Sequence, residues 1–193
     1  MIKVATIATS LVLLGVSSTS AQDVTIPQSD YWMSATVQAE GERVPMDLRH
    51  HDGKVRLETT FQEQEAVVLL DMHGEEATVL VDSPAMKMAM IIPASEANFA
   101  PAAPENLPEP MGSAVVAGES CDIYRVDDPN TGEQGDMCMT SDSIVLRLES
   151  EGETLFEADA LERADQDPSL FEVPPGYQVM RMPAGAGGPL SGH

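Results

Sequence analysis

The stretch RVPMDLRHHDGKVRLETTF, residues 43–61, contains two runs of alternating apolar and polar residues on either side of Asp52-Gly53. Alternation with a period of two places every second side chain on the same face of a β-strand. Asp-Gly is a preferred dipeptide for the two-residue turn that joins antiparallel strands. The stretch therefore predicts a β-hairpin with strands at Arg43–His50 and Lys54–Phe61.

The same alternation recurs on both sides of this hairpin, and almost nowhere does a helical stripe of period 3.6 persist. Gly residues at turn positions, such as Gly74 and Gly152, separate the runs. The other predicted strands are Tyr31–Ala39, Ala66–Met72, Ala77–Asp82, Met86–Ile92, Ser120–Val126, Gly135–Thr140, Ser143–Ser150 and Thr154–Leu161. We therefore predict a mainly β, mostly antiparallel fold in which consecutive strands are neighbours.

Two proline-containing segments interrupt this pattern. Residues 93–110 hold five prolines, which exclude a central strand and favour a crossing loop with a short helical turn. Pro168 at a first helical position begins a single turn that ends at Phe171. We expect one β-rich domain at residues 22–183 and a disordered Gly/Pro-rich tail at residues 184–193.

The first 21 residues are typical of a cleavable secretory signal peptide. Lys3 gives a positive start, Ile7 to Val16 form an apolar run, and Thr19-Ser20-Ala21 place small residues before the expected cleavage site. The apolar run is too short for a transmembrane helix, and we expect no transmembrane segment. The sequence therefore predicts an exported, periplasmic protein.

The chain is strongly acidic, with 32 Asp and Glu against 10 Lys and Arg and a net charge of −22. Nucleic acids and anionic membranes carry the same sign of charge and are repelled by such a surface. We therefore expect neither as a partner.

The two cysteines, Cys121 and Cys138, lie on predicted strands that flank one loop. In an exported chain, such a pair is expected to form a disulfide. Closing the loop between them stabilises the fold by about 3 kcal/mol in the chain-entropy account.

The run Met86-Lys-Met88-Ala-Met90 is the most distinctive in the sequence. On a strand, all three thioethers point to one face. Three interpretations stay open: core packing, the wall of a cavity for an apolar ligand, and a Cu(I) site of soft sulfur ligands.

Other candidate groups do not form a known site. His50 and His51 precede the Asp52-Gly53 turn and are interpreted as exposed turn residues. The loop at residues 128–132 begins like a calcium loop but lacks its later ligands. No nucleophile elbow, phosphate loop or zinc-protease motif is found, so we expect neither an enzyme nor a cofactor.

Three short stretches resemble one family together: residues 52–58 (DGKVRLE), Gly118-x-x-Cys121-x-x-Tyr124, and residues 170–177 (LFEVPPGY). They are similar to a domain-of-unknown-function family of exported bacterial proteins, which itself resembles the periplasmic lipoprotein carriers of the LolA/LolB type. The resemblance implies a single curved antiparallel sheet, an incomplete barrel whose concave face encloses an apolar cavity.

In such a barrel, the candidate cavity wall combines the Met86–Met90 run with alternate residues of two further strands. Its members are Met86, Met88, Met90, Val68, Leu70, Val79 and Val81. The leading hypothesis is a non-enzymatic periplasmic module that binds an apolar or acylated, lipid-like ligand. The alternatives are an envelope protein-interaction domain without a small ligand and a Met-based copper binder.

Overall fold

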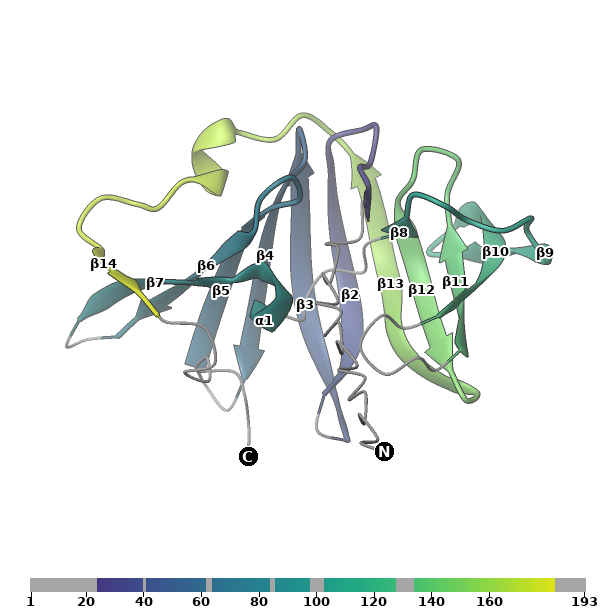
Figure 1. Ribbon diagram of the computed structural model, residues 1–193, viewed down its shortest axis with the longest axis horizontal. Coiled ribbons are helices and arrows are strands. Elements are labelled where there is room, and N and C mark those ends of the chain that lie inside the picture. The colour runs from purple at the N-terminus through teal and green to yellow at the C-terminus, as the bar shows by residue number, and fades with distance from the viewer. Residues whose placement is uncertain are drawn as a thin grey trace, which may run out of the picture.

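The structure, a computed structural model, describes residues 24–39, 41–61, 64–83, 86–97, 103–127 and 134–182. Within these ranges the chain forms one twelve-stranded sheet and a small second pair of strands (Figure 1). From one edge to the other, the order in the large sheet is β14 (Gln178–Arg181), β7 (Lys87–Pro93), β6 (Glu76–Asp82), β5 (Gln64–Asp71), β4 (Lys54–Phe61), β3 (Glu42–His51), β2 (Tyr31–Ala39), β13 (Glu153–Arg163), β12 (Val145–Ser150), β11 (Gln134–Met139), β10 (Glu119–Asp127) and β9 (Gly112–Val116). The small sheet pairs β1 (Val24–Thr25) with β8 (Ala103–Pro104).

The large sheet is open and curved. Its edges are β14 and β9, and no further strand of the described chain joins either of them. In Figure 1 both ends of the sheet come toward the viewer while β2 and β3 lie farther back, so the concave face looks to the front. This confirms the predicted fold class, a mainly β curved sheet that forms an incomplete barrel.

The hairpin of residues 43–61 forms as its sequence predicts. His51 pairs with Lys54, and the turn residues Asp52 and Gly53 have φ values of 47° and 75°. Positive φ at both central positions defines the turn type that matches the right-handed twist of two strands. Each strand predicted from the sequence is present, with its ends displaced by no more than two residues.

The structure adds strands that alternation alone did not predict. β9 and β14 are short edge strands, and β14 pairs with β7 in parallel, which makes it the exception in an otherwise antiparallel large sheet. A four-residue strand carries too little periodic signal to be recognised, and its pairing with β7 joins segments about 90 residues apart.

The proline-rich segment connects β7, near one edge of the sheet, with β9 at the other edge. Its first part forms α1 (Ala94–Ala97), which lies in front of the concave face, where Ala97 is buried (Figure 1). Farther along, Ala103 and Leu107 pack against Met137 and Met139 of β11. Met137 lies on the same face of the sheet as Phe156 and Val37, because the pairing register joins them through Leu148. This confirms the crossing loop and its short helical turn.

A C-terminal strap, residues 164–177, runs from β13 in the middle of the sheet to β14 at its edge (Figure 1). It contains the predicted helical turn η1 (Pro168–Phe171), capped by Asp167, which accepts a hydrogen bond from the Ser169 N–H at 2.9 Å. Arg49 donates to Gln166 Oε1 at 3.1 Å, and Arg56 donates to the Leu170 carbonyl at 3.0 Å. Side chains of the central hairpin thus fix the path of the strap.

The predicted signal peptide (residues 1–21), the loop at 128–133 and the tail from residue 183 lie outside the described residues. Among the helices of the described chain, none has the length and apolar character needed to cross a bilayer.

Candidate ligand-binding face

The residues predicted to line a cavity come together on the concave side of three neighbouring strands. Val68 of β5 is opposite Val79 of β6, which is opposite Met90 of β7. In the same way, Val81 of β6 is opposite Met88 of β7. We name this surface the β5–β7 wall, and its members are Val68, Leu70, Val79, Val81, Met88 and Met90. All six belong to one apolar cluster, so the pairing register makes the wall continuous.

Met86 lies at the rim of the wall and not within it. The residue precedes β7, and two backbone hydrogen bonds with Ser83, of 3.0 and 3.2 Å, continue the β6–β7 pairing to it. Its side chain is 51% exposed. Met86 therefore marks the place where the wall meets solvent.

Methionines occur in the concave cluster beyond the predicted run. Six thioethers join the same apolar cluster, and they are Met33, Met46, Met72, Met88, Met90 and Met182. Unbranched thioether side chains adapt to ligands of different shapes. Four of these residues, Met33, Met46, Met72 and Met182, were not predicted from the sequence, because each stands alone in its own segment, where alternation marks it only as apolar.

Elements next to the wall are tied down by backbone hydrogen bonds. The Ala94 N–H of α1 donates to the Glu75 carbonyl at 2.8 Å, which fixes the helical turn beside the β5–β6 turn. The Met182 N–H donates to the Ile91 carbonyl at 2.9 Å, directly after β14. Both contacts hold apolar side chains, Ala97 and Met182, against the concave cluster.

The charged groups of β6 and β7 are matched in pairs on the face opposite the wall. Lys87 Nζ lies 2.6 Å from Asp82 Oδ2 and 5.6 Å from the centre of the Tyr177 ring. The hydrogen bond to Asp82 raises the pKa of Lys87. Arg181 forms an ion pair with Glu76. Because Lys87 and Asp82 alternate with Met88 and Val81, the wall presents only apolar side chains.

The structure corrects the interpretation of His50. Its side chain is only 1% exposed, because it follows Met46 and Leu48 on the buried face of β3. The ring accepts a hydrogen bond from the Gly53 N–H at 3.1 Å, so its other nitrogen, 3.0 Å from the Ser29 carbonyl, is the protonated donor. Burial lowers the pKa of His50. We therefore assign it a neutral, structural role.

His51 occupies the opposite face of β3 and is also not a free turn residue. Its Nδ1 lies 2.6 Å from Asp30 Oδ2, and its ring contacts Phe171 of the strap, with ring centres 5.7 Å apart. The two adjacent histidines thus face opposite sides, as alternation on a strand requires. No group of three or more His, Cys, Asp or Glu side chains in the described part of the chain is arranged to hold a metal ion.

The predicted disulfide between Cys121 and Cys138 is present, and it joins β10 to β11 with a Cα–Cα distance of 5.4 Å. Both residues are buried and belong to the large apolar cluster. Disulfides persist in oxidising compartments, so the bond fits an exported protein.

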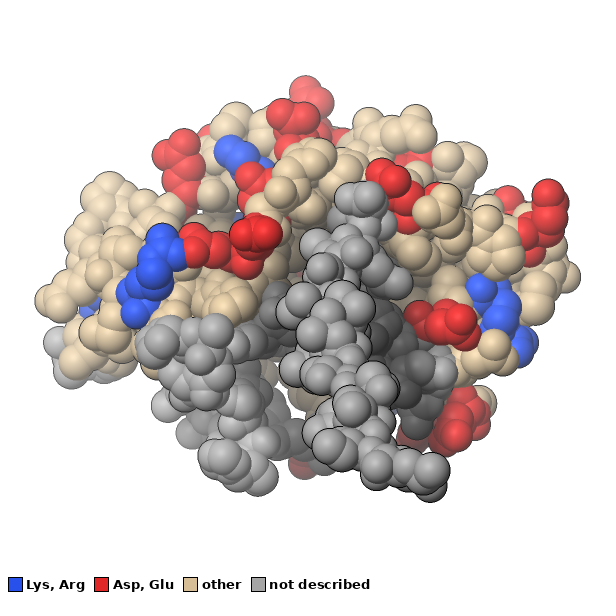
Figure 2. Space-filling model, viewed as in Figure 1, with Lys and Arg blue, Asp and Glu red and all other residues tan. Residues whose placement is uncertain are grey.

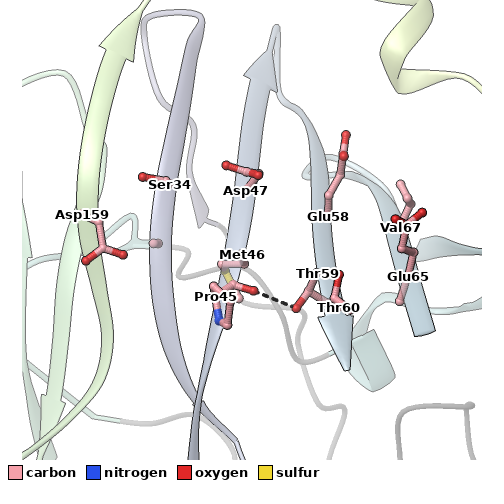
Figure 3. A pocket seen from close by; sticks show the side chains of 12 residues that line it. Ser34, Pro45, Met46, Asp47, Glu58, Thr59, Thr60, Glu65, Val67 and Asp159 are labelled. Carbon is pink, nitrogen blue, oxygen red and sulfur yellow. Dashed lines mark hydrogen bonds between the residues drawn. The ribbon is translucent and has the colours of Figure 1, made fainter. Parts of the chain in front are cut away.

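A hollow lies on the opposite, convex face of the sheet. It is an open groove of about 450 Å³ over β13, β2, β3, β4 and β5, and Figure 3 shows the carboxylates of Asp159, Asp47 and Glu58 along it. A hydrogen bond of 3.0 Å from Thr59 Oγ1 to the Pro45 carbonyl crosses its floor. The groove is lined by both polar and apolar residues and has no continuous run of opposed apolar side chains like the β5–β7 wall, so we assign the candidate site to the concave face.

Comparison with known proteins gives solved structures of the same architecture. An uncharacterized conserved protein from Thermus thermophilus is 11% identical, with a TM-score of 0.56, over 80% of this chain and 91% of that chain. PNGF-II is 12% identical, with a TM-score of 0.52, over 80% of this chain and 31% of that chain. The chain shares a fold with these proteins. It spans about a third of the length of PNGF-II.

A weaker likeness, with a TM-score of 0.43 and 17% identity, covers 80% of this chain and 56% of MucB, solved in complex with MucA(peri). No family profile and no curated protein sequence matches the chain. These likenesses concern the fold alone.

Proposed function

We propose that this protein is a non-enzymatic periplasmic binding module that holds an apolar or acylated ligand against the β5–β7 wall. The observation that carries the proposal is the continuous run of opposed Val and Met side chains on three strands, of which Val81 and Met88 are only partly buried. Binding sites for small apolar molecules are concave and mostly apolar, with few polar groups. The concave face has this character, and the charged groups of β6 and β7 are paired on the opposite face.

The methionines of the concave cluster favour a flexible apolar chain as the ligand over a molecule of rigid shape. Three of the thioethers, those of Met72, Met88 and Met182, are only partly buried. Such side chains can change rotamer to follow a flexible acyl chain, because they have three rotatable bonds and no branch. The periplasmic location in the proposal rests on the predicted signal peptide.

The experiment is displacement of a neutral hydrophobic dye, N-phenyl-1-naphthylamine, from the purified protein by palmitate. We expect the dye to become fluorescent when it binds the protein. We expect palmitate to displace the dye and so to lower its fluorescence. Met88→Gln places an amide on the wall and is expected to weaken palmitate binding about tenfold, through the loss of one buried apolar side chain. Ile91→Gln is the matched control on the opposite face of β7, and its affinity is expected to stay within twofold of the unmodified protein.

The two alternatives predict different results. A protein-interaction domain without a small ligand leaves the dye dark and binds no palmitate, which would overturn the proposal. A copper binder takes up Cu(I) from a chromogenic chelator and loses that ability in Met88→Ala, whereas our proposal expects no difference between Met88→Ala and the unmodified protein in that assay.

A further inference from the structure

Strand β9 ends the sheet at the side opposite the β5–β7 wall. It is joined to β10 by the two-residue turn Ala117-Gly118, with φ values of 52° and 80°. In a turn of this type, the flanking residues Val116 and Glu119 form a close hydrogen-bonded pair. Because hydrogen bonding alternates along an antiparallel ladder, the backbone groups of Ser113 and Val115 point away from β10, toward the open edge.

The edge is exposed and unprotected. Val115 is 68% exposed and Met111, directly before the strand, is 54% exposed. β9 contains neither proline nor a charged residue, the devices that proteins use to keep sheet edges from pairing with other chains. In Figure 1 it lies at the outer end of the sheet, and no described strand covers it.

The charges around β9 favour one kind of partner. Each arginine at this end of the sheet is already paired: Arg125 with Asp136, Arg147 with Glu149, and Arg163 with Asp142 and Glu119. By contrast, Asp122, which is opposite Ser113 on β10, and Glu109, shortly before β9, are exposed and form no ion pair within the described residues. Figure 2 shows acidic side chains spread over the visible face, with Lys and Arg in a few small groups.

We propose that β9 is a docking edge for an extended, cationic segment of a partner polypeptide, which adds a strand to the sheet. The backbone N–H and C=O groups of Ser113 and Val115 pair with the segment. Its Lys or Arg side chains lie on the face of β9 that holds Val115, beside Asp122 and Glu109, and its alternate apolar side chains lie on the face of Ala114 and Val116. Strand addition gives affinity through main-chain hydrogen bonds and selectivity through alternate side chains. A second copy of this chain is a poor occupant, because its net charge of −22 has the same sign. The inference is independent of the proposed ligand-binding function.

The test uses the full protein and a designed probe, the peptide acetyl-KVKVKVK-amide, with acetyl-EVEVEVE-amide and the proline-interrupted acetyl-KVKPKVK-amide as comparison peptides. We expect only the first to bind by isothermal titration calorimetry, with an affinity that falls as salt is added. On binding, the amide protons of Ser113 and Val115 are expected to gain protection from hydrogen exchange in NMR spectra. Equal binding of the Lys and Glu peptides would overturn the charge argument.

Two matched variants locate the binding edge. Val115→Lys adds a positive charge at β9 and is expected to weaken binding of the Lys peptide at least about tenfold. Val179→Lys makes the same change on β14, where Val179 is 62% exposed, and is expected to leave the affinity within twofold. Equal affinity in the two variants would overturn the assignment to β9. If sedimentation shows that the unmodified protein is a dimer and that Val115→Lys is a monomer, the occupant of β9 is a second copy of this chain, and the proposal of a cationic partner is overturned.

Discussion

The His50 ring stacks on the Tyr31 ring, with ring centres 5.3 Å apart and planes inclined by 19°. Tyr31 and His50 are opposite each other on β2 and β3, at the end of the buried face. Burial raises the pKa of Tyr31 and lowers that of His50, so both rings are neutral in the folded protein. The pair closes one end of the concave cluster.

The lowered pKa of His50 predicts a loss of stability in mild acid. The unfolded chain binds a proton at this histidine near its ordinary pKa of 6.5, whereas the folded chain resists it. The contribution of His50 is therefore complete above pH 6.5 and declines as the pH falls below that value. Urea unfolding at pH 7.5 and pH 5 measures the change. His50→Gln is expected to flatten the difference, and His73→Gln, at an exposed turn residue, to retain it.

Among the surface residues, Arg163 is expected to lower the stability of the fold most when it is substituted. Its guanidinium donates to both carboxylate oxygens of Asp142, at 2.8 and 3.0 Å, and lies 3.0 Å from Glu119. The hydrogen bonds from Arg163 hold the pKa of Asp142 well below its ordinary range. Arg163→Lys keeps the charge but loses the two-pronged geometry, so we expect a loss of about 1–2 kcal/mol in the free energy of unfolding. An unchanged unfolding midpoint in urea would contradict this role.

Gly135 of β11 leaves no room for a side chain. A Cβ at this position would lie 2.6 Å from the Glu149 carbonyl oxygen on β12, and this oxygen belongs to the backbone of a paired strand. Gly135→Ala is expected to destabilise the fold by about 1–3 kcal/mol through the resulting displacement of the strands. Gly112→Ala is the control, since a Cβ there meets no atom within 4 Å. Thermal unfolding of the two variants should differ accordingly.

Reduction of the Cys121–Cys138 bond is expected to lower the free energy of unfolding by about 3 kcal/mol, because it releases a loop of 17 residues in the unfolded chain. Unfolding with and without dithiothreitol measures the difference. A double Cys→Ser variant, insensitive to dithiothreitol, should match the reduced protein. If the oxidised and reduced proteins unfold at the same denaturant concentration, the stabilising role is wrong.

Local patterns in the sequence were sufficient for the strands but not for all of their partners. Alternation and turn dipeptides predicted the hairpin at 43–61 and the pairing of consecutive strands. They could not predict that β13 pairs with β2, or that β14 pairs with β7, because those contacts depend on packing between distant segments. The short edge strands, β9 and β14, owe their structure to the neighbour they join.

The apolar residues of the candidate site could be predicted from the sequence, but the full extent of the site could be predicted only in part. The alternation that selects Met88, Met90, Val79 and Val81 for one face is a local property of each strand. His50 was misjudged because proximity to a turn suggested exposure, whereas β3 continues through His51 and keeps His50 on the buried side. The carboxylates of the convex groove were not singled out, since an acidic residue on an alternating strand is the ordinary solvent-facing pattern.

The pairing of β2 with β13 has a consequence for how the chain reaches its fold. Thr36 Oγ1 donates to Asp159 Oδ2 across the middle of the sheet, from a position 123 residues away in the sequence. Contacts between such distant segments form slowly, because a long loop must close before they are gained. The two halves of the sheet cannot join until nearly the whole chain has been synthesised. The sheet therefore closes late, and its two halves exist side by side as separate units while the chain is being made.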